Sequence, residues 1–347
     1  MDEAAVREAL AGLTNERGAP LLAPDEIASV VTEGEWAAVV VSREGAPREL
    51  LTRVHRHLRD AFPEATIEVR TDERIYRGGA GFGEGKQVVA VLGGKGGVGK
   101  STLAVNLALT LSAMGVAVGL LDGDLNAPDV PHLLGIHPKK APGGFGAQLQ
   151  STRVTPPSQR PRPHERFGVE MMSVGFVVPE RFPTLVTTRY LLSTLMRYLI
   201  FDIDWNADVL IIDAPPGTGE ELQVMARELP LSGVVFVTTP QDLAQMDAER
   251  TLTLLTEHDV PVIGWVQNMA SMTCPHCEQE IDMFAQSTRL ADAGLEIIGR
   301  IPFDVQLSFA ADKGRPLVLG DPRGPIAYEF ARIATSVRRW LAARDAG

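Results

Sequence analysis

The segment at residues 94–101 reads GKGGVGKS and fits the pattern G-x-x-x-x-G-K-[ST] at every fixed position. A short apolar run at 88–92 precedes it, and the residues after it repeat leucine every four positions, at Leu103, Leu107 and Leu111. A strand, a glycine-rich turn and a helix in this order are typical of a phosphate-binding loop. The glycines let backbone N–H groups converge on an anion, and the helix N-terminus adds positive charge. The sequence therefore predicts a site for ATP or GTP with magnesium.

The loop residues have different expected roles. Lys100 is expected to reach the β- and γ-phosphates, and Ser101 to ligate Mg²⁺. The whole set predicted to bind the nucleotide is Gly94, Lys95, Gly96, Gly97, Val98, Gly99, Lys100, Ser101 and Thr102. The same glycines also spell G-x-G-x-x-G, with Asp122 at about the distance of the ribose-binding acid of a dinucleotide site. Lys100 and Ser101 decide against that alternative, because a dinucleotide site needs neither a lysine nor a metal-binding hydroxyl there.

Three carboxylates are expected beside the loop. Asp213 ends the apolar run 209–212, and we expect it to hold the magnesium through a water molecule. Asp122 and Asp124 follow the run 116–121, at the carboxyl edge where ligands bind in such sheets. One of the two could orient the attacking water while the other supports the metal. We assign Asp124 to catalysis and Asp122 to the nucleotide site.

Short apolar runs alternating with helical stretches predict the fold class. The runs are residues 88–92, 116–121, 209–212, 234–238 and 262–266. Such runs suit strands buried on both faces of a parallel sheet, so we expect an α/β fold with a doubly wound, mostly parallel sheet. Ahead of it, helices at 4–13 and 47–62 and strands at 36–42 and 65–70 predict a small α/β domain.

The length of 347 residues favours two domains. We predict the small domain over residues 1–76, a glycine-rich linker over 77–86 and the phosphate-loop domain over 87–347. Within the latter, residues 137–167 are rich in proline, glycine and arginine, which predicts a mobile surface insertion. Its arginines could bind a partner, but a solvated loop is the simpler interpretation.

The composition narrows the partners. A net charge of −11 argues against a general nucleic-acid binder, which needs a basic surface to neutralise phosphates. No apolar run approaches the roughly 18–20 residues that span a bilayer, so no membrane partner is expected. The acidic start of the chain lacks the features of an export signal, and we expect a cytoplasmic protein.

Lys95 is a second lysine in the loop, which a standard phosphate loop does not require. With it, the sequence resembles the deviant Walker A ATPases, the group that includes MinD, ParA, the nitrogenase iron protein and the Mrp/ApbC proteins. The resemblance implies that Lys95 reaches across a homodimer to the nucleotide of the partner. Such a cation would act in trans like an arginine finger. The resemblance thus implies catalytic roles for Lys95 and Lys100 and a face-to-face homodimer.

Further segments narrow the resemblance to the Mrp/ApbC proteins and extend it from about Gln87 to the C-terminus. They are DAPPGTG at 213–219, TTPQ at 238–241, MSVGF at 172–176, Asn268-Met269 and Ile301-Pro302. By this resemblance, Asn268 contacts the adenine base. The resemblance also implies ATP as the nucleotide and a small α/β domain ahead of the ATPase.

The chain has two cysteines, Cys274 and Cys277, in the sequence CPHC. Thiolates at this spacing can share one metal ion or one iron of a cluster. A cluster needs about four ligands, so the other two must come from a second subunit or from another type of ligand. The homodimer implied by Lys95 would supply two more thiolates. The resemblance implies a labile 4Fe–4S cluster held between subunits, with cluster scaffold proteins and apo iron–sulfur proteins as partners.

Three other interpretations of the cysteine pair remain open. It could be a dithiol–disulfide couple, it could hold zinc together with His276 in a dimer, or it could be inert. The leading function is an ATP-dependent iron–sulfur cluster carrier. The alternative is a ParA/MinD-type positioning ATPase that acts on DNA or membrane.

The positioning alternative is suggested by the amphipathic C-terminal segment 325–344 with its arginines, Arg332, Arg338 and Arg339. The apolar residues of that segment favour packing on the sheet instead. They are Phe330, Ile333, Val337 and Leu341.

Overall fold

The computed structural model describes residues 1–15, 18–42, 48–71, 75–76, 86–124, 127–136, 157–176, 189–216 and 219–345. The chain forms two compact units, each with a sheet of its own. The first comprises Met1–Gly85, Leu149–Arg162 and Ile200–Asp204, and the second comprises the rest of the chain. Of the predicted linker 77–86, the described residues include Lys86 alone. Residues 137–156 of the predicted insertion also lie outside them.

The first unit is a small α/β fold. Its elements are α1 (Glu3–Gly12), the 3₁₀ turn η1 (Pro24–Glu26), β1 (Ile27–Glu33), β2 (Trp36–Val41), α2 (Arg48–Ala61), β3 (Thr66–Thr71) and β4 (Ile75–Tyr76). The strands lie in the order β1-β2-β3-β4, with β2 and β3 parallel and the outer pairs antiparallel. One face of the sheet packs Val39 and Ile67 against Leu10 of α1 and Leu58 of α2. The two helices and two strands predicted here are confirmed to within one residue, whereas β1 and β4 were not predicted.

The second unit is built on a nine-stranded sheet. In chain order its strands are β5 (Gln87–Leu92), β6 (Val118–Asp122), β7 (His164–Arg166), β8 (Val169–Ser173), β9 (Val209–Asp213), β10 (Leu231–Thr238), β11 (Val262–Thr273), β12 (Glu280–Ile281) and β13 (Ile297–Phe303). They lie in the order β12-β11-β10-β5-β9-β6-β8-β7, and β13 also pairs with β11. The pairs made by β7 and β12 are antiparallel and the others parallel. The predicted fold class is confirmed, with β5 at the centre.

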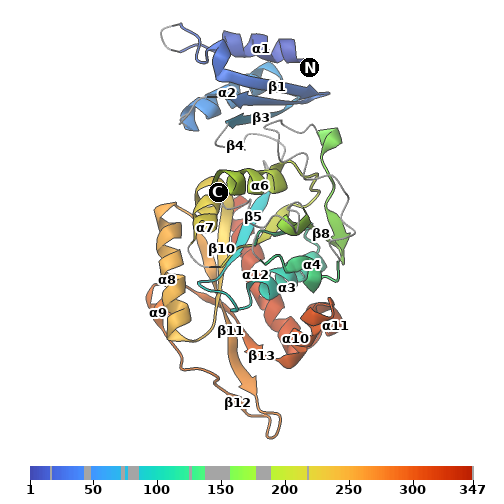
Figure 1. Cartoon of the computed structure of the whole chain (residues 1–347), viewed down its shortest axis with the longest axis vertical. Helices are drawn as coiled ribbons and strands as arrows, with labels where there is room; N and C mark the ends of the chain where they lie inside the picture. The colour runs from blue at the N-terminus through green and yellow to red at the C-terminus, as the bar shows by residue number, and fades with distance from the viewer. Residues whose placement is uncertain are drawn as a thin grey trace. The chain divides into compact units, whose positions relative to one another are not determined.

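Helices cover both faces of this sheet. They are α3 (Lys100–Ala113), α4 (Val130–Leu133), α6 (Arg189–Phe201), α7 (Glu220–Glu228), α8 (Asp242–Glu257), α9 (Arg289–Asp292), α10 (Val305–Asp312), α11 (Leu317–Gly320) and α12 (Pro325–Asp345). α3 and α12 share one core with alternate residues of the central strands, and α8 lies on the other side of the sheet (Figure 1). Short 3₁₀ turns, η3 (Pro157–Gln159) and η4 (Val174–Phe176), complete the described elements.

The C-terminal segment predicted to pack on the sheet forms α12. Phe330, Ile333, Val337 and Leu341 are buried in the core that α12 shares with α3, so the packing predicted for the C-terminal segment is confirmed. Within the described residues, no helix combines the length and the apolar character required to cross a bilayer.

Residues 157–167 were predicted to be loop, but they include η3 and β7, because β7 pairs with β8 at the edge of the sheet.

Candidate nucleotide and metal-binding sites

The phosphate loop lies between β5 and α3, at the centre of the sheet. α3 begins at Lys100, and Gly97 and Gly99 before it have left-handed φ angles of +81° and +93°. Glycine adopts this conformation without the steric cost that a Cβ atom would add. The backbone N–H groups of Gly97, Gly99 and Lys100 donate to no acceptor in the described part of the chain. These free donors and the first turn of α3 form the anion site that the sequence predicts.

Close packing holds this loop on two sides. On one side, Nδ2 of Asn268 on β11 donates to the carbonyl oxygen of Val98 at 2.8 Å. A Cβ atom at Gly99 would lie 2.3 Å from that same Nδ2. On the other side, a Cβ atom at Gly94 would lie 2.5 Å from the backbone nitrogen of Ala248 on α8. Only glycine fits at 94 and 99, and the loop is in contact with both β11 and α8.

A cavity of about 650 Å³ opens over the loop. Of the predicted site residues it is lined by Gly96, Gly97, Gly99, Lys100, Ser101, Thr102, Asp124 and Asn268. These residues come from the phosphate loop, the segment after β6 and the strand β11. The structure therefore brings three separate parts of the sequence to one cavity, whose volume is in the range typical of small-ligand sites.

Asp213 ends β9, the strand next to β5, and is buried. Burial raises its pKa to about 7, although the Ser101 hydroxyl and the Lys100 ammonium act in the opposite direction. The Ser101 hydroxyl is near enough to lower this pKa, but neither carboxylate oxygen accepts a hydrogen bond of normal geometry from the described residues. A buried carboxylate with unused oxygens beside a hydroxyl suits a divalent cation, so the residues present fit Mg²⁺.

Asp122 and Asp124 have different places in the structure. Asp122 is buried and accepts a hydrogen bond from the Ser173 hydroxyl at 2.9 Å and two from the backbone N–H groups of Asp124 and Val130 at 3.3 Å. Burial and the neighbouring Asp213 carboxylate raise its pKa well above the usual range. Asp124 lines the cavity, whereas Asp122 does not. Asp122 thus lies beneath the residues that line the cavity, deeper than predicted. Its hydrogen bonds position the segment that carries Asp124.

Three predicted loop residues do not line the cavity of their own chain. Gly94 packs against α8, and Val98 is buried in the core beneath the loop. Lys95 is half-buried and makes no hydrogen bond or ion pair with any described residue. The Lys95 ammonium therefore has no bonding partner within the described part of the chain. Its catalytic role in trans stays a prediction.

Cys274 and Cys277 lie in the turn between β11 and β12, at the far end of the hairpin that projects from the second unit in Figure 1. The turn is closed by backbone hydrogen bonds from Cys274 to Gln279 at 2.8 Å and from Glu278 to Cys274 at 2.9 Å. The backbone N–H groups of Cys277 and His276, and then the Cys277 thiol, lower the pKa of Cys274. Such donors stabilise a thiolate, which is the form that binds metals.

The cysteine pair is not a complete metal site by itself. Both cysteines are free thiols. Over the residues that the structure describes, no group of three or more histidine, cysteine, aspartate or glutamate side chains is placed to hold a metal ion. The pair therefore offers two ligands, and a cluster bound there requires further ligands from elsewhere.

Several residues that line the cavity were not among the predicted site residues. They are Ala127, Asp129, His132, Leu133, Pro216, Met269, Pro302, Phe303, Asp304, Leu307, Ser308, Ala311 and Asp312. Pro216, Met269 and Pro302 belong to segments that the sequence had singled out. The remainder follow β6 or lie at and after the carboxyl end of β13, and the α10 residues carry no motif, so only the strand order could have indicated them.

Comparison with known proteins identifies the family. Residues 84–338 match the ParA family model that is described as NUBPL iron-transfer P-loop NTPase. The chain belongs to this family.

Relatives in the NUBPL-type family support the match. The iron-sulfur cluster carrier protein of Aquifex aeolicus is 38% identical over 254 residues, which span 72% of this chain and 66% of the Aquifex protein, just under two thirds. The iron-sulfur cluster transfer protein NUBPL of Mus musculus is 36% identical over 262 residues, or 74% of this chain and 78% of the mouse protein.

Solved structures show the same fold. A nucleotide-binding protein of Archaeoglobus fulgidus in complex with ADP is 30% identical, with a TM-score of 0.52 over 70% of this chain and 91% of its own. MinD of Pyrococcus horikoshii with Mg-ADP has a TM-score of 0.56 over 73% of this chain and 96% of its own. At 20% identity, the likeness to MinD shows the P-loop NTPase fold alone.

Proposed function

We propose that this NUBPL-type P-loop NTPase is an ATP-dependent iron–sulfur cluster carrier. It receives a labile 4Fe–4S cluster from a scaffold protein, holds it as cargo between two copies of the chain and transfers it to apo-proteins. The observation that carries the proposal is the cysteine turn, in which backbone N–H groups favour the Cys274 thiolate while one chain supplies only two cysteines. Two copies supply the four thiolates that a 4Fe–4S cluster requires.

The nucleotide cavity supports the ATPase part of this proposal. Lys100 would bind the β- and γ-phosphates, and Ser101 would ligate Mg²⁺ with Asp213 behind it. Asp124 lines the cavity where it can orient a water molecule for attack on the γ-phosphate. The Lys95 side chain, which has no partner among the described residues, would act on the nucleotide of the second copy. When bound, Mg²⁺ would offset the charge that develops on the transferred phosphoryl group.

Family membership supports the cargo. The relatives from Aquifex and mouse are named as a cluster carrier and a cluster transfer protein. Free thiols and a labile cluster both require a reducing compartment, which favours the cytoplasm. No described feature favours a positioning ATPase, because the apolar face of α12 is buried in the core and the MinD likeness is one of fold.

Anaerobic reconstitution tests this function. Wild-type protein should bind about four irons and four sulfides per dimer, and Cys274→Ala and Cys277→Ala should bind none. A stable zinc ion with no iron uptake would favour the zinc interpretation. Full cluster content in both variants would refute the proposal, because the bound iron would then not depend on the cysteine turn.

A further inference from the structure

The hairpin that carries Cys274 and Cys277 has two legs, and its outgoing leg is the second half of β11, which passes the nucleotide cavity at Asn268 and Met269. Asn268 on this strand donates to the Val98 carbonyl of the phosphate loop, six positions before Cys274. Met269 follows with a left-handed φ of +52° and lines the cavity. β12 then pairs with the end of β11, at Met272 and Thr273. One strand thus connects the phosphate loop directly to the cysteine turn.

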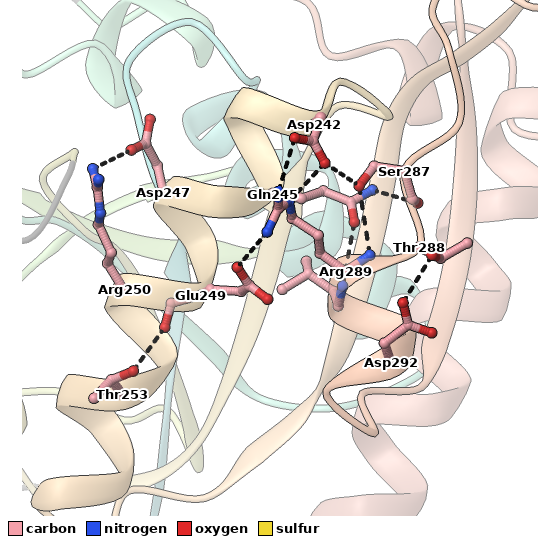
Figure 2. Close-up of polar contacts among 11 residues, drawn as sticks. Asp242, Gln245, Asp247, Glu249, Arg250, Thr253, Ser287, Thr288, Arg289 and Asp292 are labelled. Atoms are coloured by element: carbon pink, nitrogen blue, oxygen red, sulfur yellow. Dashed lines mark hydrogen bonds and ion pairs between the residues drawn. The ribbon is translucent and has the colours of Figure 1, made fainter.

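The return leg, residues 282–292, lies against α8 (Figure 2). Gln245 of α8 is fully buried, and both ends of its amide bind this leg. Its Nε2 donates to the carbonyl oxygen of Ser287 at 3.0 Å, and its Oε1 accepts from the N–H of Leu290 at 3.3 Å. Buried polar groups need hydrogen-bond partners, and the return leg supplies both partners of the Gln245 amide. A shift of the leg along α8 would break these two bonds, so the leg is held in one register on the helix.

Arg289 adds an ion-pair clamp at the same place, which Figure 2 shows between α8 and the return leg. Its Nε lies 2.6 Å from Oδ1 of Asp242 and its Nη2 lies 3.1 Å from Oδ2, which is a bidentate pair. Its Nη1 lies 3.4 Å from Glu249, and the Ser287 hydroxyl donates to Asp242 at 2.9 Å. The Arg289 side chain is 41% exposed, so the pair adds little to stability. Its main effect is to fix the geometry of the leg.

The same helix is in contact with the phosphate loop. A Cβ atom at Gly94 would lie 2.6 Å from the carbonyl carbon of Asp247, in addition to its clash with Ala248. Asp247 stands between the two clamp acids, Asp242 and Glu249, in the sequence of α8. A packed helix moves as a rigid element. A displacement of the loop at Gly94 would therefore shift α8, and with it the two carboxylates that bind Arg289.

We propose that Arg289 is a positioning residue that couples the nucleotide bound at the phosphate loop to the metal held at Cys274 and Cys277. The inference rests on the proposed function, since it requires both ligands. The phosphate loop touches β11 at Asn268 and α8 at Gly94, so both legs of the hairpin follow the loop when phosphates bind. By linkage, a nucleotide that alters cluster affinity has its own affinity altered by the same factor.

The test measures cluster release from reconstituted full-length protein. An iron chelator is added anaerobically without nucleotide, with ADP, or with a non-hydrolysable ATP analogue, and the loss of visible absorption is followed. In wild-type protein we expect the release rates to differ at least about fivefold between nucleotide states. In Arg289→Gln and Asp242→Asn, the nucleotide-free rate should stay within about twofold of wild type while the nucleotide effect falls below about twofold.

Arg250→Gln is the matched control. Arg250 is likewise an exposed arginine, but it lies on α8 itself and pairs within that helix, with Asp247 at 3.1 Å. Its loss removes a similar ion pair without touching the return leg, so the nucleotide effect should persist. An undiminished effect in Arg289→Gln, or no effect in wild type, would overturn the coupling while cluster binding stands. Wild-type protein that takes up no cluster would refute the proposed function and the coupling with it.

Discussion

Asp213 is a carboxyl group buried at the end of β9, and this burial raises its pKa. Two other features of single residues govern the sites. At Gly99 the phosphate loop can pack against Asn268 only because glycine has no side chain. The Cys274 thiolate is stabilised by backbone N–H groups of its own turn. Each leads to a measurement of its own.

The raised pKa of Asp213 predicts a pH-dependent stability in the nucleotide-free protein. In the folded state Asp213 has a pKa of about 7, so it keeps a proton that the unfolded chain releases near the ordinary aspartate pKa of about 3.9. Stability contributed by this group therefore falls as pH rises from about 4 to about 7 and is level above that, by at most about 4 kcal/mol. Asp213→Asn should unfold at a higher temperature than wild type at pH 8 and lose this slope, while magnesium-dependent ATP hydrolysis is lost. Parallel pH profiles of the two proteins would contradict the assignment.

Gly99→Ala should impair both folding and nucleotide binding. The left-handed backbone costs an alanine about 1–2 kcal/mol, and its methyl group would displace Asn268 from the loop. ATP affinity should fall by at least about tenfold, equivalent to about 1.4 kcal/mol, as measured by calorimetry. Gly115→Ala is the control, because its φ is also left-handed, at +85°, but no atom lies within 4 Å of the added carbon. It should lose stability alone, and equal ATP binding by both variants would count against the role of Asn268.

Cys274 should react with iodoacetamide faster than Cys277 in the reduced, metal-free protein at pH 7. Cys277 is the more exposed of the two, so accessibility alone favours the opposite order. The lowered pKa of Cys274 makes more of it thiolate, the reactive form. Mass spectrometry of the alkylated peptides measures both rates, and the difference should shrink as pH rises. Faster modification of Cys277 at pH 7 would show that the turn does not activate Cys274.

The sequence indicated some of these residues better than others. Lys100 and Ser101 belong to a continuous motif, so their place in the cavity followed from eight residues. The burial of Asp122 could not be predicted from its spacing to Asp124, because it depends on Ser173, which only the pairing of β6 with β8 brings near. The Arg289 clamp carries no motif and exists only because the return leg crosses α8.

Among the strands of the second unit, uninterrupted apolar runs were predictable and mixed runs were not. β5, β9 and β10 are short and apolar, as expected for strands buried on both faces. β8 carries Glu170 and β13 contains a glycine, an arginine and a proline, so neither has the pattern of a buried strand. Both form because they pair with strands whose register the rest of the sheet already fixes.

Phe330→Ala tests the packing of α12. Phe330 is fully buried against the sheet, so its truncation should cost about 3–5 kcal/mol in the free energy of unfolding. Tyr328→Ala, on the same helix at 67% exposure, should change that energy by less than about 0.5 kcal/mol. Urea unfolding gives both values. A small loss in Phe330→Ala would mean that the helix can leave the core, as the positioning alternative requires.

For the whole molecule, the proposed function requires two copies of the chain. The predicted role of Lys95 in trans can be tested by mixing two inactive variants. A chain with Lys100→Ala should not hydrolyse the nucleotide in its own site. A chain with Lys95→Ala should bind nucleotide but should not promote hydrolysis in the site of its partner. A mixed dimer has one site with Lys100 in place and Lys95 supplied by the other chain, so mixing should restore part of the ATPase rate. A mixture no more active than its components would place Lys95 outside the partner's site.

Native mass spectrometry of the anaerobically reconstituted protein shows whether one cluster is shared by two chains. We expect a dimer that carries one 4Fe–4S cluster, and a complete loss of that added mass in Cys274→Ala and in Cys277→Ala. A cluster bound to a single chain, or one retained by either variant, would contradict this expectation.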